Sequence, residues 1–128
     1  MKLLDTGLLI DLQRERGAGG SGPAHRYLAQ GGGEEYCIST ITALEFLESY
    51  AHLADGERFL AAFPQLDINA EVSRLGSRIR RDLRLRGEPI GDFDVLIAAT
   101  ALSAGLPLVT DNLRHFQRVE GLVVEGYR

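Results

Sequence analysis

Five acidic residues stand at positions where a sheet protein can use them for chemistry. Asp5 ends a short apolar run, Glu45 lies early in a predicted helix after a buried strand, and Asp111 follows another apolar run. Asp92 and Asp94 open an apolar helix whose packing places its start near the same edge of the sheet. Ligands of an open parallel sheet bind beyond the carboxyl ends of its strands. We therefore expect these carboxylates to gather at one edge.

A cluster of carboxylates indicates a hard metal ion. Clustered carboxylates repel one another and cost stability unless a cation neutralises them. Oxygen ligands without a Cys or His set favour Mg²⁺ or Mn²⁺. Such a site can activate water and stabilise an in-line displacement at phosphorus. The pattern predicts metal-dependent hydrolysis of a phosphodiester.

Three of these acids also have a structural interpretation. Asp92 is a good N-cap, and Asp94 in the first helical turn favours the helix dipole. Glu45 can simply face water on its helix, since charged residues usually do. Asp5 is harder to explain structurally, because Thr6 after it is already a suitable cap for the first helix.

Strands that alternate with helices predict an α/β fold, with a mainly parallel central sheet and helices on both faces. We expect a single domain over residues 1–128. The predicted strands are residues 2–5, 36–39, 66–68, 106–110 and 122–124. The predicted helices are residues 6–16, 24–30, 40 or 42 to about 53, 55–63, 70–86, 92–104 and 111–116.

Composition excludes several classes of protein. With 45% hydrophobic and 25% charged residues in 128, the chain is neither disordered nor fibrous. The single Cys37 excludes an intramolecular disulfide framework and a multi-cysteine zinc site, and its predicted strand indicates a packing role. Asp5 and Asp11 interrupt any signal-like apolar run, and the longest apolar stretch, 95–109, is short for a membrane span. We expect a cytoplasmic protein that does not bind a membrane.

The chain resembles the PIN domain family, and more narrowly the VapC-type toxins of type II toxin–antitoxin pairs. The motifs are modest singly, but they occur in the family's order over nearly the whole chain. They are Leu3-Leu4-Asp5-Thr6, Glu45 in a Thr-rich helix start, Pro89-Ile90-Gly91-Asp92-Phe93-Asp94-Val95-Leu96-Ile97-Ala98-Ala99, Leu108-Val109-Thr110-Asp111-Asn112 with His115-Phe116, and Gly121-Leu122-Val123-Val124.

The resemblance implies a set of site residues. The family's first acid, which precedes Ser or Thr, matches Asp5; its second acid matches Glu45; and the acid before its Ile-Ala-Ala run matches Asp94. The fourth position falls on Asn112, with Asp111 beside it as the alternative. We expect the first three to bind the metal and to be catalytic. The accessory residues are then Thr6, Asp92, Thr110, Asp111 and Asn112. Thr6 and Thr110 would orient ligands or the scissile phosphate, and Asp92 would contact a second metal or only cap its helix.

The resemblance also implies an activity and partners. It implies a PIN-like sheet between helices and a magnesium-dependent endoribonuclease, in which Mn²⁺ can substitute for Mg²⁺. The family's usual partners are RNA as substrate, a small VapB-like antitoxin that covers the acidic site, and a second copy of the chain in a homodimer. An apolar groove over Leu44, Leu47 and Phe59 is our hypothesis for the antitoxin's docking site.

The one basic concentration of the chain lies in the predicted long helix, residues 70–86. The formal net charge is −4, so the protein is not basic overall, but a local patch can still bind nucleic acid. A solvated helix face is the plain interpretation. The alternative is that Arg80, Arg84 and Arg86 contact RNA phosphates.

Other functional classes have specific objections. Residues 17–22 spell G-x-G-x-x-G, but a charged helical stretch precedes them instead of the strand that a dinucleotide site requires. A receiver-type signalling domain needs a lysine near its acids, and Lys2 is the only lysine. A phosphatase with Asp-x-Asp has Gly7 at its second acid. A non-catalytic PIN-like interaction domain remains the alternative function.

Overall fold

The computed structural model describes residues 1–128, and a five-stranded parallel sheet forms its centre. The strand order is β3-β2-β1-β4-β5, so the first strand of the chain lies in the middle. Leu3 pairs with Cys37 on one side and with Leu108 on the other. The strands are β1 (Lys2–Leu4), β2 (Tyr36–Ser39), β3 (Gln65–Leu66), β4 (Leu108–Val109) and β5 (Val124–Glu125). The carboxyl end of β1 is therefore flanked by those of β2 and β4.

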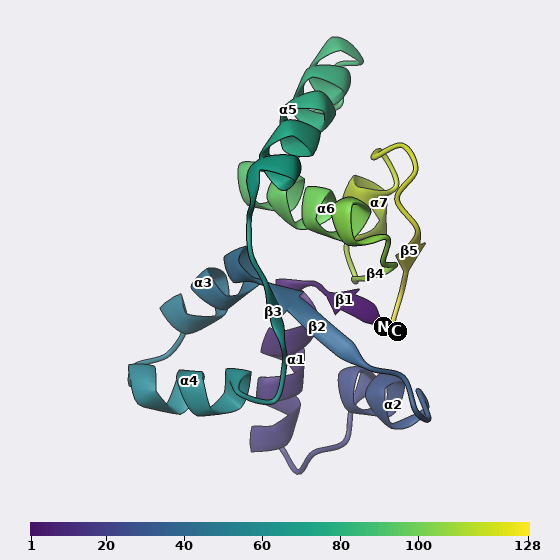
Figure 1. Ribbon diagram of the computed structural model, residues 1–128. Helices are drawn as coiled ribbons and strands as arrows, with labels where there is room; N and C mark the ends of the chain where they lie inside the picture. The colour runs from purple at the N-terminus through teal and green to yellow at the C-terminus, as the bar shows by residue number, and fades with distance from the viewer.

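Helices cover both faces of this sheet, as predicted (Figure 1). α5 and α6 pack on one face, while α1, α2, α3 and α4 lie on the other. The helices are α1 (Thr6–Gly17), α2 (Pro23–Ala29), α3 (Thr40–Glu48), α4 (Leu53–Leu60), α5 (Ala70–Leu85), α6 (Asp92–Ala104) and α7 (Leu113–Phe116). None of them combines the length and the apolar character that crossing a membrane requires.

Two apolar layers separate the helices from the sheet. Successive strand side chains point to opposite faces, so Leu3 and Leu108 belong to the layer under α5 and α6. Their neighbours Leu4 and Val109 belong to the layer under α1, α3 and α4. Burial on both faces explains why these strands read as continuous apolar runs. The predicted α/β fold with a parallel sheet is confirmed.

Helix boundaries follow the capping residues in most cases. Asn69 accepts the backbone N–H of Val72 at 3.0 Å, which starts α5 as predicted. Gly105 adopts φ 66° and ends α6 at the predicted residue. The residue that caps α1 is Asp5 and not Thr6, because the Asp5 carboxylate accepts the Thr6 N–H. Gly91, and not Asp92, occupies the N-cap position of α6.

Short elements deviate most from their predicted bounds. α4 begins at Leu53, ahead of the cap predicted at Asp55. β3 lies at Gln65–Leu66 and β5 at Val124–Glu125, each displaced by one residue or more from the predicted strand. Pairing with a neighbouring strand sets such short strands, because a run of two or three residues carries little pattern of its own.

Candidate active site

Asp5 sits at the carboxyl end of the central strand, with both carboxylate oxygens engaged. The Thr6 backbone N–H donates to Oδ1 at 2.8 Å, and the Thr110 hydroxyl donates to Oδ2 at 2.7 Å. Thr110 follows β4, the neighbour of β1, and its hydroxyl also accepts the backbone N–H of Asn112 at 3.0 Å. Asp5 is only 8% exposed, so its position is fixed by the fold.

Glu45 reaches the same region from α3, the helix that follows the neighbouring strand β2. Ser39 ends β2 and caps α3 by accepting the Thr42 backbone N–H at 3.0 Å. Glu45 lies two residues after the first turn of α3. Its carboxylate accepts a hydrogen bond from the Thr6 hydroxyl at 2.7 Å. The Thr42 hydroxyl lies 3.1 Å from that of Thr6 and is completely buried. Sequence reasoning did not select Thr42 for the site; its only signal was a hydroxyl three residues before Glu45.

Asp94 approaches from the opposite face of the sheet. It lies in the first turn of α6, and α6 is held in place by the apolar face of α5. Val95 and Ala99 pack close to Gly76 of α5, where a larger residue would meet their side chains. This packing leaves Asp94 half-buried, facing the charges of Asp5 and Glu45.

The three acids form a concentration of negative charge, and the pKa values of Asp5 and Asp94 are raised. Burial raises the pKa of Asp5 to about 6, and the charges of Asp94 and Glu45 act in the same direction. The hydrogen bonds from Thr110 and the Thr6 backbone oppose this rise of the pKa only in part. Burial, and next the charge of Glu45, also raises the pKa of Asp94. A cation in this region would relieve both the burial cost and the repulsion.

The donor set fits a hard divalent cation. All three side chains offer carboxylate oxygens, and no nitrogen or sulfur ligand accompanies them, which suits Mg²⁺ or Mn²⁺. The charges of Asp94 and Glu45 raise the pKa of Asp5. No three Asp, Glu, His or Cys side chains, however, are close enough together to hold one ion. The two observations agree, because Coulomb interactions reach farther than a coordination bond. Rotation of Glu45 and Asp94, both partly exposed, would be needed to close the site around an ion.

The two residues considered for the fourth position point to different partners. The Asp111 carboxylate accepts a hydrogen bond from Arg128 Nε at 2.7 Å. The Asn112 amide nitrogen lies 2.9 Å from His115 Nδ1. Neither side chain contacts Asp5. Asn112 is linked to the site through its backbone N–H, which holds the Thr110 hydroxyl.

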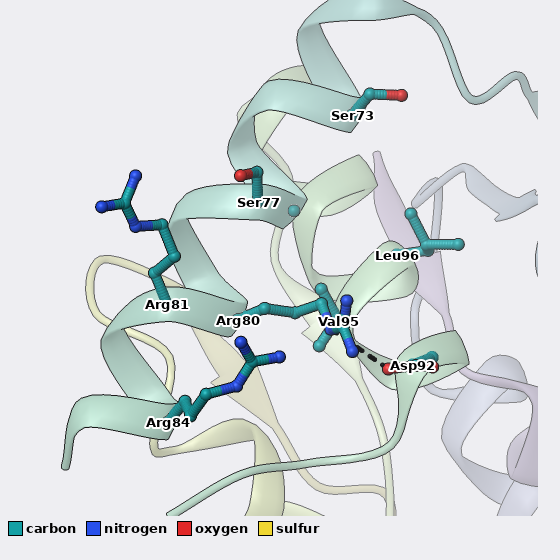
Figure 2. A pocket seen from close by; sticks show the side chains of 9 residues that line it. Ser73, Ser77, Arg80, Arg81, Arg84, Asp92, Val95 and Leu96 are labelled. Carbon is teal, nitrogen blue, oxygen red and sulfur yellow. Dashed lines mark ion pairs between the residues drawn. The ribbon is translucent and has the colours of Figure 1, made fainter.

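Asp92 opens α6, and the arginines considered for RNA binding belong to α5 or directly follow it. Asp92 pairs with Arg80 of α5, with an Nε–Oδ1 distance of 3.2 Å (Figure 2). Arg84 lines the same pocket as this pair. Arg86 does not line this pocket. Its guanidinium pairs with Asp82 and donates to the backbone carbonyl of Arg118. Cys37 is fully buried, in agreement with its predicted packing role.

Comparison with known proteins decides the family. The model of the PIN domain matches residues 2–122. The chain belongs to the PIN domain family. This confirms the resemblance inferred from the acidic motifs, and the fold predicted with it.

The relatives are of the VapC type. Ribonuclease VapC19 of Mycobacterium tuberculosis is 35% identical over 120 residues, which cover 91% of this chain and 92% of that protein. The tRNA(fMet)-specific endonuclease VapC of Salmonella typhimurium is 37% identical over 98 residues, 71% of this chain and 74% of that protein. The crystal structure of DNA-bound VapBC from Salmonella typhimurium matches with a TM-score of 0.84 at 28% identity, over 100% of this chain and 99% of that chain.

Proposed function

We propose that this PIN-domain protein is the toxin of a VapBC-type toxin–antitoxin pair, and that it is an endoribonuclease dependent on Mg²⁺ or Mn²⁺. The observation that carries the proposal is the grouping of Asp5, Glu45 and Asp94 around the carboxyl end of the central strand. A ribonuclease relative that is 35% identical over nine-tenths of both chains supports the RNase activity.

The chain's own residues would divide the work in a simple way. Asp5, Glu45 and Asp94 would hold the cation, which when bound supplies a positive charge next to the scissile phosphate and lowers the pKa of a nearby water. Thr110 would keep the Asp5 carboxylate in one orientation, as it does through the hydrogen bond at 2.7 Å. Thr6 would do the same for Glu45.

The accessory residues would act indirectly. Asn112 would position Thr110 through its backbone N–H. Asp111 is engaged by Arg128, so we propose that it stabilises the C-terminal segment and does not contact the cation. Asp92 is exposed and paired with Arg80, so we propose that it belongs to the surface beside the site and does not bind the cation.

The partner expected from the relationship is a VapB-type antitoxin. The VapBC complexes of Salmonella typhimurium and nontypeable Haemophilus influenzae share this fold, with TM-scores of 0.84 and 0.81. The docking groove expected for the antitoxin lies over Leu44, Leu47 and Phe59. Of these, Leu44 is 43% exposed, whereas Leu47 and Phe59 are half-buried against the layer under α3 and α4. We propose that Leu44, with the 61% exposed Leu53 of α4, offers most of the apolar surface to the antitoxin. Assembly into a homodimer stays a prediction.

The decisive test is metal-dependent cleavage of RNA by the purified chain. We expect cleavage of total RNA in Mg²⁺ or Mn²⁺, none in a chelator, and a loss of at least a hundredfold in Asp5→Asn and Asp94→Asn. Asp55→Asn is the matched control, because Asp55 is an exposed acid of α4 that pairs with Arg58.

Each outcome of this test has a distinct meaning. Cleavage that survives both substitutions would show that the carboxylate assignment is wrong. Absence of cleavage, together with absence of a Mn²⁺-induced rise in the melting temperature, would favour the non-catalytic interaction domain. Absence of cleavage with a clear rise in the melting temperature would indicate a metal site that needs a more selective RNA substrate.

A further inference from the structure

A polar groove separates α5 from the first turn of α6, beside the candidate active site. Its volume is about 480 Å³, and Ser73, Ser77, Arg80, Arg81 and Arg84 of α5 line it together with Asp92. Ser73, Ser77, Arg80 and Arg84 recur at intervals of three and four, so they form one stripe along the helix, and Arg81 lies at its side. This stripe is adjacent to the buried stripe that packs on α6. The groove therefore results from the same packing that positions Asp94.

Two guanidinium groups in the groove carry charge that the protein does not neutralise. Arg80 faces Asp92, but neither Arg81 nor Arg84 takes part in an ion pair. Arg84 extends toward Arg80 and Asp92, whereas the Arg81 side chain points away from Asp92 (Figure 2). In a chain of net charge −4, this is a local excess of positive charge. Unpaired arginines suit bidentate recognition of phosphate oxygens.

The hydroxyl groups extend the same chemistry along the helix. Ser73 and Ser77 lie one turn apart on the stripe, and both are exposed. From Ser73 to Arg84 the stripe spans roughly 16 Å, at about 1.5 Å per helical residue. Hydroxyl and guanidinium donors in a row match a ligand with repeated acceptor oxygens, such as a nucleic-acid backbone.

The groove is linked to the candidate active site by the first turn of α6. Asp92 of this turn lines the groove, and Asp94 of the same turn belongs to the acidic site. Phe93 stands between them in the sequence, and it is the only aromatic among the large apolar side chains that are exposed. Unstacked bases of single-stranded RNA stack on such exposed rings. Phe93 is therefore available to a base of a strand that extends from the groove toward the carboxylates.

We infer that the groove between α5 and α6 binds the phosphate backbone of single-stranded RNA through Arg81 and Arg84, and guides the strand past Phe93 to the acidic site. The inference rests on the proposed ribonuclease function and assigns the path of its substrate. Its physical reason is that three carboxylates repel RNA, so a cationic surface next to them is needed to retain the strand. Binding through the backbone is independent of sequence and sensitive to salt.

The test measures binding separately from cleavage. A fluorescein-labelled single-stranded RNA of mixed sequence is titrated with the full chain in EDTA, and anisotropy is followed between 50 and 200 mM salt. Arg81→Ala/Arg84→Ala is compared with Arg74→Ala/Arg78→Ala. The control removes the same charge from the same helix, but from exposed residues that do not line the groove.

We expect about tenfold weaker binding for Arg81→Ala/Arg84→Ala. The slope of log K against log salt concentration should become shallower by about 1.4, because two phosphate contacts are lost. The control should bind within about twofold of the parent protein. Arg81→Lys/Arg84→Lys, which keeps the charge, should restore the salt dependence but only part of the affinity, because Lys cannot make the bidentate contact. Phe93→Ala should weaken binding of single-stranded RNA and leave binding of duplex RNA unchanged.

Three results would overturn the inference. Equal losses in the two double variants would show that only the overall charge of α5 matters. No loss in either would assign the groove to another ligand, such as an acidic segment of a protein partner. No binding of RNA by the parent chain would also remove it. If RNA binds through the groove but is not cleaved in Mn²⁺, the proposed function fails while the groove assignment stands.

Discussion

Replacement of Asp5 by Asn should stabilise the metal-free protein while abolishing its activity. The pKa of the Asp5 carboxyl rises from 3.8 to about 6 on folding, because of burial and then of the charge of Asp94, with Glu45 adding to it. Since a tenfold change in an equilibrium constant is worth about 1.4 kcal/mol, this rise costs roughly 3 kcal/mol once the group is ionised. Asn has the same shape and no charge, so it avoids that cost.

Part of the gain is lost in hydrogen bonding. Oδ1 of the new residue still accepts the Thr6 N–H and caps α1. The amide NH₂, however, replaces the oxygen that accepts the Thr110 hydroxyl, and this hydroxyl already accepts the Asn112 N–H. One hydrogen bond is lost or rearranged, at a cost of about 1 kcal/mol. We expect a net gain near 2 kcal/mol at neutral pH, or roughly 8 °C in melting temperature.

The pH dependence provides the sharper test. A folded-state pKa above the unfolded value means that the folded protein binds the proton more tightly. The parent protein is therefore destabilised fully above pH 6, and the penalty disappears as the pH falls from about 6 toward 4. The advantage of Asp5→Asn should follow the same course, reach zero between about pH 4 and 5, and become a small disadvantage at pH 4, where the lost hydrogen bond outweighs the relieved charge.

Urea unfolding in EDTA, followed by circular dichroism at pH 4, 6 and 7.5, measures this difference directly. Asp92→Asn is the matched control, because Asp92 is 74% exposed and its pair with Arg80 is worth little. An Asp5→Asn protein that is no more stable than the parent at pH 7.5 would refute the reasoning. So would an advantage of the same size at pH 4.

Three further outcomes follow from the structure. Thr110→Val should weaken Mn²⁺ binding and destabilise the fold by about 1–3 kcal/mol, because it removes the donor to Asp5; Mn²⁺ titration and urea unfolding measure the two effects. Asp111→Asn should leave RNA cleavage within about threefold of the parent rate, since Arg128 and not the site engages this carboxylate; a hundredfold loss would instead place Asp111 in the metal site. Cys37 should resist alkylation at pH 8 until urea unfolds the chain, because it is fully buried and burial raises the pKa of its thiol; rapid labelling of the native protein would contradict the buried strand.

Long helices were the most predictable elements of this chain. The ends of α5 and α6 are encoded by nearby residues: Asn69 accepts a backbone N–H at the start of α5, and Gly105 takes the left-handed conformation after α6. Such local signals need no tertiary partner. Local pattern was ambiguous at Asp5 and Thr6, because both residue types are good caps. The bond between the Thr6 hydroxyl and Glu45, more than thirty residues away, leaves Asp5 to cap the helix.

The presence of acidic residues near the carboxyl end of the central strand was predictable from residue type and order, and the hard cation that they favour stays a prediction. Their chemistry depends on carboxylate oxygens at strand ends, and strand ends are visible as apolar runs in the sequence. The relation of Asp5, Glu45 and Asp94 to the carboxyl edge follows from the parallel topology, which alternating strands and helices predict.

Side-chain partners, by contrast, were decided only by the tertiary structure. Nothing local distinguishes Asp111 from Asp94 as an acid near a strand or helix end; the difference is that Arg128 lies beside one and the buried Asp5 beside the other. Arg84 and Arg86 differ by only two residues, yet one lines the groove and the other pairs with Asp82. The amino-acid sequence by itself determined the fold class and the kind of chemistry, because both follow from residue type and period. Only the tertiary structure decided which charges meet, because that depends on contacts between residues far apart in the chain.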